Sequence, residues 1–276
     1  MTDQGERYDR IAAGYLRWWA PVLVLDAVAT LDLVAGDVAA GAGRILDLGT
    51  GTGTLGLAAV QRWPTVRVTG IDVSTEMAHA ATLEADRRLR GADRARFESV
   101  VGYADELPFE DAGFDVVVSS FVLQLVPSRA RALREARRVL RPGGRIAYVT
   151  WLAGGDRFAG DEIFDQVLDE AGIGARDDED GGAPDIASPE AAAQGLRRAG
   201  FSQVRATAAT LEHRFGVDGY VGFLEEFDEE DLFAGLVERK RTRVVARLRE
   251  RLAQLPPDDL VLRLPIVRAT GVVPRG

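Results

Sequence analysis

A short run of glycines follows an apolar stretch of the sequence and could hold a nucleotide-like ligand. Residues 45–48 read Ile-Leu-Asp-Leu, a short buried strand, and Gly49, Gly51 and Gly53 follow at every second position. Glycine lets the backbone adopt positive φ and approach a ligand closely. The next helix would offer unpaired N–H groups to a carboxylate or phosphate. The G-x-G-x-G spacing differs from the G-x-G-x-x-G fingerprint of dinucleotide sites.

Two aspartates stand where they could recognise the rest of such a ligand. Asp47 lies two positions before the first glycine, and Asp72 ends the next apolar run, residues 67–71. A carboxylate at this second position can accept two hydrogen bonds from a ribose diol. Either aspartate alone could equally cap a turn or a helix. Both together, in this order, favour a nucleoside-binding crevice.

Composition limits the other chemistry open to the chain. Its 276 residues include no cysteine and two histidines, His79 and His213. Disulfides, thiolate metal sites and a cysteine nucleophile are therefore excluded, and we expect no metal. The net charge of −9 argues against binding to nucleic acid. The acidic N-terminus and the lack of a long apolar stretch predict a cytoplasmic protein with no membrane contact.

The hydrophobic pattern around the glycines alternates between strands and helices. Several of the strands are unbroken apolar runs, which predicts a mostly parallel sheet covered on both faces. Right-handed crossovers then give a doubly wound α/β fold. We expect one helix before Pro21 and one after it, with a kink or break at the proline. The expected strands are residues 44–48, 67–71, 96–101, 115–119, 145–150, 203–215 and 259–272. The expected helices are residues 53–63, 74–90, 128–140, 161–171, 189–199 and 231–255, and residues 176–184 are expected to form an acidic loop.

Several motifs together resemble one enzyme family, the class I S-adenosylmethionine-dependent methyltransferases. The similarity is greatest to the branch of ubiquinone/menaquinone C-methyltransferases and natural-product methyltransferases, and it covers residues 7–151. The motifs are residues 45–53, residues 71–74 with Met77, and residues 107–109, 114–117 and 138–146.

The resemblance implies a Rossmann-like seven-stranded sheet with N-terminal lid helices and a C-terminal helical cap. It implies one domain over residues 1–276, with N-terminal helices at 1–40, a cofactor-binding core at 41–152, a variable insertion at 153–200, and the last strands at 201–276 with the cap near 216–256.

The same resemblance assigns residues to the cofactor. Gly49, Thr50 and Gly51 would line its methionine part, with Asp47 steering the amino group directly or through water. Asp72 would hold the ribose hydroxyls. The other cofactor contacts implied are Val73 and Met77 on the adenine, Tyr8 from the lid, and Ser119 and Phe121 after the fourth strand.

One position departs from the family pattern. Relatives carry an acidic or amide residue after the third strand, where this chain has Tyr103. Either the Tyr103 ring covers the adenine, or Asp105 supplies the polar contact, while the Ala104 N–H binds the ring.

The acceptor side offers few groups for acid–base catalysis. Many relatives have histidines after the fourth strand, where this chain has Gln124 and Leu125. We therefore expect catalysis mainly by proximity, with Gln124, His213 and Tyr15 as candidates for a catalytic role. The aromatic N-terminal helix is either a lid or simply docked on the sheet. The substrate contacts we expect are Tyr15, Trp18, Trp19, Gln124, Trp151 and His213.

These expectations define one main function and two alternatives. The main one is methyl transfer from S-adenosylmethionine to a small hydrophobic or aromatic metabolite in natural-product biosynthesis, with S-adenosylhomocysteine as the product. A protein of the same fold could instead catalyse a non-methylating reaction. An NAD(P)-dependent oxidoreductase is disfavoured by the glycine spacing and by the lack of a Tyr-x-x-x-Lys pair. The expected partner is a small molecule, and a homodimer is compatible with the sequence.

Overall fold

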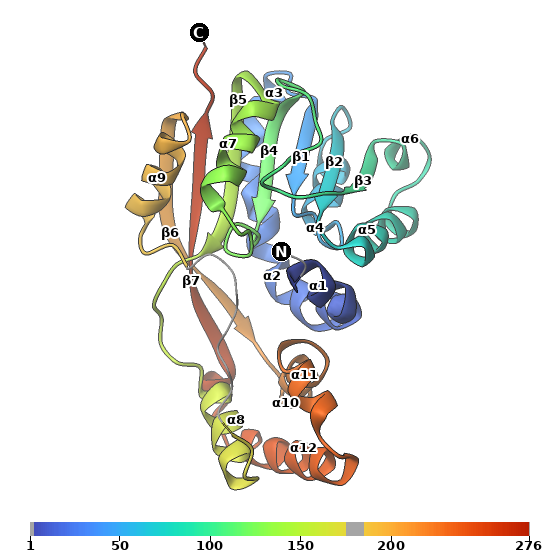
Figure 1. Ribbon diagram of the computed structural model, residues 1–276, viewed down its shortest axis with the longest axis vertical. Coiled ribbons are helices and arrows are strands. Elements are labelled where there is room, and N and C mark those ends of the chain that lie inside the picture. Colours follow the sequence, from blue (N-terminus) through green and yellow to red (C-terminus); the bar gives the residue numbers. More distant parts are fainter. Residues whose placement is uncertain (1–2, 175–184, 276) are drawn as a thin grey trace.

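A seven-stranded sheet forms the centre of the protein (Figure 1). The computed structural model describes residues 3–174 and 185–275. The strand order is β3-β2-β1-β4-β5-β7-β6. Every neighbouring pair from β3 to β5 is parallel, and β7 runs antiparallel to β5 and β6. The strands are β1 Arg44–Leu48, β2 Arg67–Asp72, β3 Phe97–Val101, β4 Phe114–Ser120, β5 Leu140–Trp151, β6 Ser202–Arg214 and β7 Val261–Val272. The predicted doubly wound, mostly parallel sheet is confirmed.

Helices cover both faces of the sheet, as the unbroken apolar strands require. Successive side chains of a strand point to opposite faces: Val117 of β4 shares an apolar cluster with Leu133 of α7, and its neighbour Val116 shares another with Leu57 of α4. One face is covered by α7 (Arg129–Val139) and α9 (Pro189–Arg198), and the other by α4 (Thr54–Arg62) and α5 (Thr75–Arg88). A short helix, α6 (Gly91–Arg94), precedes β3.

The N-terminal segment is helical throughout and has its irregularity just before Pro21. It consists of α1 (Asp3–Gly14), a π-helical turn η1 (Tyr15–Trp19), α2 (Ala20–Ala29), a 3₁₀ turn η2 (Thr30–Val34) and α3 (Ala35–Ala39). Pro21 lies in the first turn of α2. Proline is tolerated there because the first backbone N–H groups of a helix have no partner within it. The predicted break between two helices is confirmed, because the π turn separates α1 from α2 and Pro21 lies in the first turn of the second helix.

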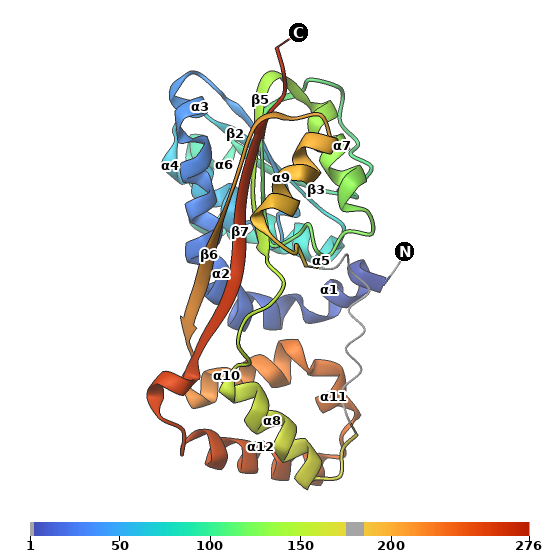
Figure 2. The same ribbon diagram turned by 90° about the vertical axis from the view of Figure 1, so that its left-hand side faces the viewer.

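A helical cap stands at one end of the molecule (Figures 1 and 2). Strands β6 and β7 extend beyond the other strands as a long antiparallel ribbon, and the cap helices lie at its far end. The cap shares one apolar cluster with the N-terminal helices. It consists of α8 (Ala159–Glu170), α10 (Val217–Phe223), a π turn η3 (Leu224–Asp228), α11 (Glu230–Gly235), α12 (Glu238–Leu252) and a 3₁₀ turn η4 (Pro257–Leu260).

The cap corrects one helix prediction. A single helix over 231–255 is wrong, because α11 ends at Gly235 and both Leu236 and Val237 are extended. Glycine is a poor helix former, and the extended Leu236 side chain packs against the cap core. The predicted acidic loop at 176–184 lies outside the described residues. In the part of the chain that the structure describes, no helix is both long and apolar enough to cross a membrane.

Candidate active site

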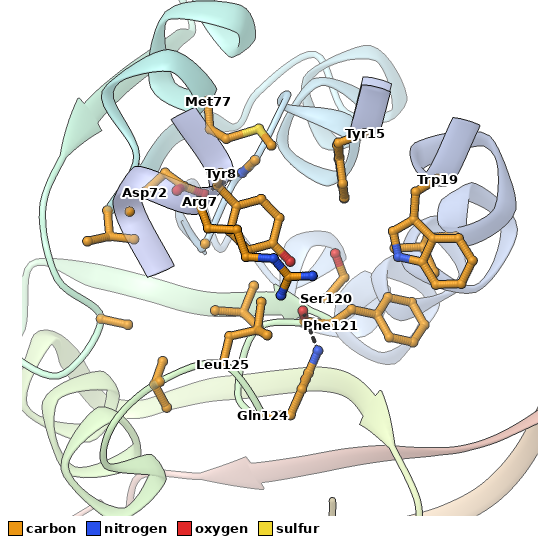
Figure 3. A pocket seen from close by; sticks show the side chains of 18 of the residues that line it. Arg7, Tyr8, Tyr15, Trp19, Asp72, Met77, Ser120, Phe121, Gln124 and Leu125 are labelled. Atoms are coloured by element: carbon orange, nitrogen blue, oxygen red, sulfur yellow. Dashed lines mark hydrogen bonds between the residues drawn. The ribbon is translucent and has the colours of Figure 1, made fainter. Parts of the chain in front are cut away.

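A cavity of about 780 Å³ lies at the carboxyl ends of β1, β2 and β4 (Figure 3). Its other walls come from α1 and η1 on one side and from the cap turn η3 on another. In open α/β sheets, ligands bind at the carboxyl ends of the strands, where the direction of winding reverses. The strand order reverses between β1 and β4, so the cavity occupies the place that the fold provides for a ligand.

The glycine turn after β1 forms part of the cavity wall. Gly49, Gly51 and Gly53 all have positive φ, at 70°, 53° and 84°. A Cβ at Gly49 would lie 2.3 Å from the Val122 side chain, so only glycine fits there. At Gly51 the nearest atom to an added Cβ is in the Tyr15 ring, 3.9 Å away. The turn is therefore tightly held at its first glycine and open to the cavity at its second.

Asp47 holds this turn from inside the protein. Its carboxylate is buried, and Oδ2 accepts hydrogen bonds from Thr50 Oγ1 (2.8 Å) and Gly56 N (2.9 Å). Among the described residues, Oδ1 has no partner. Burial raises the pKa of Asp47 to about 6. Neither Asp47 nor Thr50 lines the cavity, so both act on a ligand through the position of the turn.

Asp72 reaches the cavity itself, at the end of β2 (Figure 3). Its Oδ2 accepts a hydrogen bond from Gly51 N (2.8 Å) and its Oδ1 from Ser74 N (3.0 Å). Burial raises the pKa of this carboxyl group above its ordinary value. Each carboxylate oxygen can accept more than one hydrogen bond, so Asp72 can hold a ligand diol while it fixes the glycine turn. Val73 and Met77 line the cavity beside it.

The segment after β3 lines the same end of the cavity. Tyr103, Ala104 and Asp105 all contribute to the lining. The Tyr103 side chain is half exposed, and the Asp105 carboxylate faces Arg131 at 4.0 Å. The structure therefore places both candidates, Tyr103 and Asp105, at the cavity.

The opposite end of the cavity is aromatic. The Phe121 ring lies 4.3 Å from the Trp151 ring, and the Trp19 ring lies 6.2 Å from Trp151. Phe227 of the cap stacks with Trp19 at 6.0 Å. Tyr15 stands between the two ends, and burial raises the pKa of its hydroxyl further above neutrality. A hydroxyl with a raised pKa keeps its proton at neutral pH and can donate a hydrogen bond.

Besides Asp47 and Thr50, three predicted site residues lie away from the cavity. The Trp18 indole donates a hydrogen bond to Glu226 Oε2 at 2.7 Å. His213 is on β6 with its ring 4.6 Å from that of Phe215, and burial lowers its pKa. The Ser119 hydroxyl donates to the Leu48 carbonyl at 2.8 Å. The predicted site residues that the cavity does bring together are Tyr8, Tyr15, Trp19, Gly49, Gly51, Asp72, Val73, Met77, Tyr103, Ala104, Asp105, Phe121, Gln124 and Trp151.

The cavity also contains residues that the sequence did not single out. Arg7 lines it, and among the described lining residues it is the one cationic side chain. A signal was present, since Arg7 precedes Tyr15 by eight positions and such residues share a helix face. The other lining residues missed are Gly5, Leu23, Val122, Leu125, Val126, Pro127, Asp185 and Asp228.

Comparison with known proteins finds a family and relatives that are similar to part of the chain. A methyltransferase domain family matches residues 46–148. A ubiquinone/menaquinone biosynthesis C-methyltransferase from Geotalea daltonii is 38% identical over 105 residues, which cover 38% of this chain and 43% of that protein. The chain thus spans less than half the length of the curated relatives it matches.

Solved structures support the fold over nearly the whole chain. The (4+2)-cyclase SpnF has a TM-score of 0.59 at 22% identity, covering 99% of this chain and 96% of that one. A phosphoethanolamine N-methyltransferase from Haemonchus contortus, solved with S-adenosylhomocysteine, has a TM-score of 0.55 at 19% identity, covering 99% and 59%. At these identities the likeness establishes the architecture alone.

Proposed function

We propose, from the premise that residues 46–148 form a class I S-adenosylmethionine-dependent methyltransferase domain, that this chain transfers the cofactor's methyl group to a small hydrophobic or aromatic acceptor. One observation carries the proposal. A single cavity joins the open glycine turn and Asp72 at one end to a wall of aromatic rings at the other. The two ends suit a nucleoside-containing cofactor and an apolar acceptor, respectively.

The residues at the first end fit the cofactor. S-adenosylmethionine, when bound, supplies an electrophilic methyl group on a sulfonium. The Asp72 carboxylate lies in the cavity with capacity to accept from a ribose diol. Met77 and Val73 offer apolar contact to the adenine, and Arg7 is suited to the carboxylate of the amino-acid part.

The residues at the second end position the acceptor and keep water away from it. Trp19, Phe121 and Trp151 present flat apolar surface, which suits a ring or another hydrophobic group. Both histidines are described, and neither lines the cavity. We therefore assign the rate chiefly to proximity, which holds nucleophile and methyl group in line. The acceptor is then one that ionises easily, such as a phenol or an enolisable carbon, or an amine.

The acceptor is a metabolite rather than a nucleic acid in this proposal. The net charge of −9 opposes attraction to a phosphate backbone. The long β6–β7 ribbon carries the cap over the acceptor end, and the cap turn η3 supplies Phe227 to the wall. We assign such an acceptor to natural-product chemistry.

Calorimetry and mass spectrometry test the two halves of the proposal. We expect S-adenosylhomocysteine to bind with a dissociation constant on the order of micromolar, corresponding to about 8 kcal/mol, and NAD⁺ not to bind. With S-adenosylmethionine present, a member of a panel of phenols, enolisable ketones and amines should gain the mass of one methylene group.

A matched pair of variants ties binding to the cavity. Asp72→Asn should weaken S-adenosylhomocysteine by roughly tenfold or more, because a charge-assisted hydrogen bond is about twice as strong as a neutral one. Asp86→Asn, the same change at an exposed ion pair on α5, should leave binding unchanged. Binding of NAD⁺ in place of S-adenosylhomocysteine, or equal effects of the two variants, would refute the proposal.

A further inference from the structure

We propose that Gln124 is a positioning residue, which together with Thr150 holds the turn after β4 in the one shape that serves both ends of the cavity. Gln124 lies where many relatives of the resembled family carry a histidine, so a catalytic role is the obvious alternative. The assignment of the aromatic wall to the acceptor rests on the proposed function. The hydrogen-bond chain itself does not depend on it.

The Gln124 amide has a hydrogen-bond partner in the protein at each of its two ends. The side chain is 9% exposed. Its Nε2 donates to the Phe121 carbonyl at 2.7 Å (Figure 3), and its Oε1 accepts from Thr150 Oγ1 at 2.5 Å. A carbonyl oxygen only accepts hydrogen bonds, so the –NH₂ must face Phe121 and the orientation of the amide is determined. Gln124 therefore lines the cavity while each end of its amide is bonded to the protein.

Phe121, whose carbonyl accepts the hydrogen bond from Gln124, has an unusual backbone conformation. Phe121 has φ of +54°, a conformation that is unfavourable for a residue with a side chain. Such a conformation persists only where surrounding contacts hold it in place. The Phe121 N–H donates to the Val149 carbonyl at 2.9 Å, and its own carbonyl is held by Gln124. The Gln124–Thr150 pair thus supplies one of the two bonds that fix this residue.

The held turn serves both ends of the cavity. On the acceptor side, the Phe121 ring packs on Trp151, the residue directly after Thr150. On the cofactor side, the next residue, Val122, lies where a Cβ on Gly49 would be only 2.3 Å from it. Releasing the turn would move the aromatic wall and the support of the glycine turn together. Gln124 acts through these neighbours and not through contact with the reacting atoms.

Two substitutions at Thr150 separate this role from simple packing. Thr150 is fully buried and does not line the cavity. Thr150→Val keeps the shape and removes the hydroxyl donor, whereas Thr150→Ser keeps the donor and removes a methyl group. A positioning role predicts that Val is the harmful change and Ser the mild one. A packing role predicts the opposite order.

The readouts do not require a known acceptor. In crystals grown with and without S-adenosylhomocysteine, the Val variant should show residue 121 outside the left-handed region or the Gln124 amide rotated, and the Ser variant should match the wild type. The indole N–H resonance of Trp151, assigned with Trp151→Phe, should shift in the Val variant alone. The melting temperature should fall more for Val than for Ser, an order that is readable even if the Val variant is poorly folded.

Catalytic efficiency should change in the same order as the structural readouts, with Thr150→Val the more harmful substitution. For an acceptor found in the panel, kcat/KM should fall by roughly 10- to 100-fold in Thr150→Val, since small displacements of positioned groups have effects of this size, and stay near wild type in Thr150→Ser. An unchanged Phe121 backbone and Trp151 resonance in the Val variant, or a more damaging Ser variant, would overturn the inference. Failure of the wild type to bind S-adenosylhomocysteine would instead count against the proposed function, because the crystallographic and resonance readouts are also made without it.

Discussion

Replacing Asp47 by asparagine should stabilise the protein at neutral and alkaline pH without disturbing the glycine turn. The two hydrogen bonds that the carboxylate accepts, from Thr50 and Gly56, end on the same oxygen, Oδ2. The other oxygen has no partner among the described residues. An asparagine carbonyl can take the Oδ2 position and keep both bonds. The change therefore removes a buried charge while it preserves the local geometry.

The magnitude follows from the pKa of the buried group. Burial raises the pKa of Asp47 from 3.8 to about 6, and each unit corresponds to about 1.4 kcal/mol. Because the pKa is higher in the folded state, folding is favoured by protonation: this contribution is complete below about pH 4 and is lost as the pH rises through about 6. At about pH 8 the charge on Asp47 thus lowers the free energy of unfolding by about 3 kcal/mol relative to its value at acid pH. The unpaired asparagine –NH₂ costs about 1 kcal/mol, which leaves a net gain of about 2 kcal/mol.

Urea unfolding at acid and alkaline pH measures this difference directly. The stability gain of Asp47→Asn should be about 2 kcal/mol at about pH 8 and should vanish or turn into a loss of about 1 kcal/mol at about pH 4. Asp86→Asn, at an exposed ion pair, is the control and should show little dependence on pH. An effect of Asp47→Asn that is equal at both pH values would refute the reasoning. Unchanged affinity for S-adenosylhomocysteine would separate holding the turn from direct contact with the cofactor.

Three further predictions concern the N-terminal helix and His213. Asp9 Oδ1 accepts from the Ser74 hydroxyl (2.5 Å) and the Glu76 N–H (3.1 Å), so Asp9→Ala should speed S-adenosylhomocysteine dissociation several-fold in stopped-flow measurements; an unchanged rate would contradict a lid. A Cβ at Gly14 would lie 1.7 Å from a cap carbonyl, so Gly14→Ala should lower the melting temperature by several degrees, as overpacking costs about 1–3 kcal/mol, while Gly36→Ala, with open space around it, should not. His213→Ala should leave the turnover rate unchanged. A loss of turnover in this variant would show that the imidazole acts as a base.

The sequence predicted the end of the cavity that carries the glycine turn and Asp72, because the determinants there are local. The turn after β1 needs glycines within a few positions of one another, and Gly49, Gly51 and Gly53 adopt the positive φ that their spacing indicated. Asp72 follows directly from the end of an apolar run, and it lines the cavity. The central strands were predicted to within a few residues because a buried parallel strand leaves an unbroken apolar run.

The acceptor end depends on contacts between segments far apart in the chain, and spacing alone does not reveal them. The role of Gln124 rests on Thr150, which lies on the neighbouring strand. Asp47 looked like a ligand contact in the sequence, yet its bonds to Thr50 and Gly56 turn it away from the cavity. The residue types were informative in each case, but their direction was set by tertiary structure.

The tryptophan pair in η1 shows most clearly why. The sequence predicted the same role for Trp18 and Trp19, because an ordinary helical period does not say which of two adjacent rings faces the ligand. Both tryptophans belong to the π turn η1, and the structure places their rings differently. Trp19 lines the cavity, and Trp18 packs on the cap, where a Cβ on Gly222 would lie 2.4 Å from its ring. A second π turn, η3, stands opposite and contributes Phe227 to the same wall. Since π turns are rare and often occur at functional sites, this facing pair is itself an argument that the aromatic end of the cavity is where the acceptor binds.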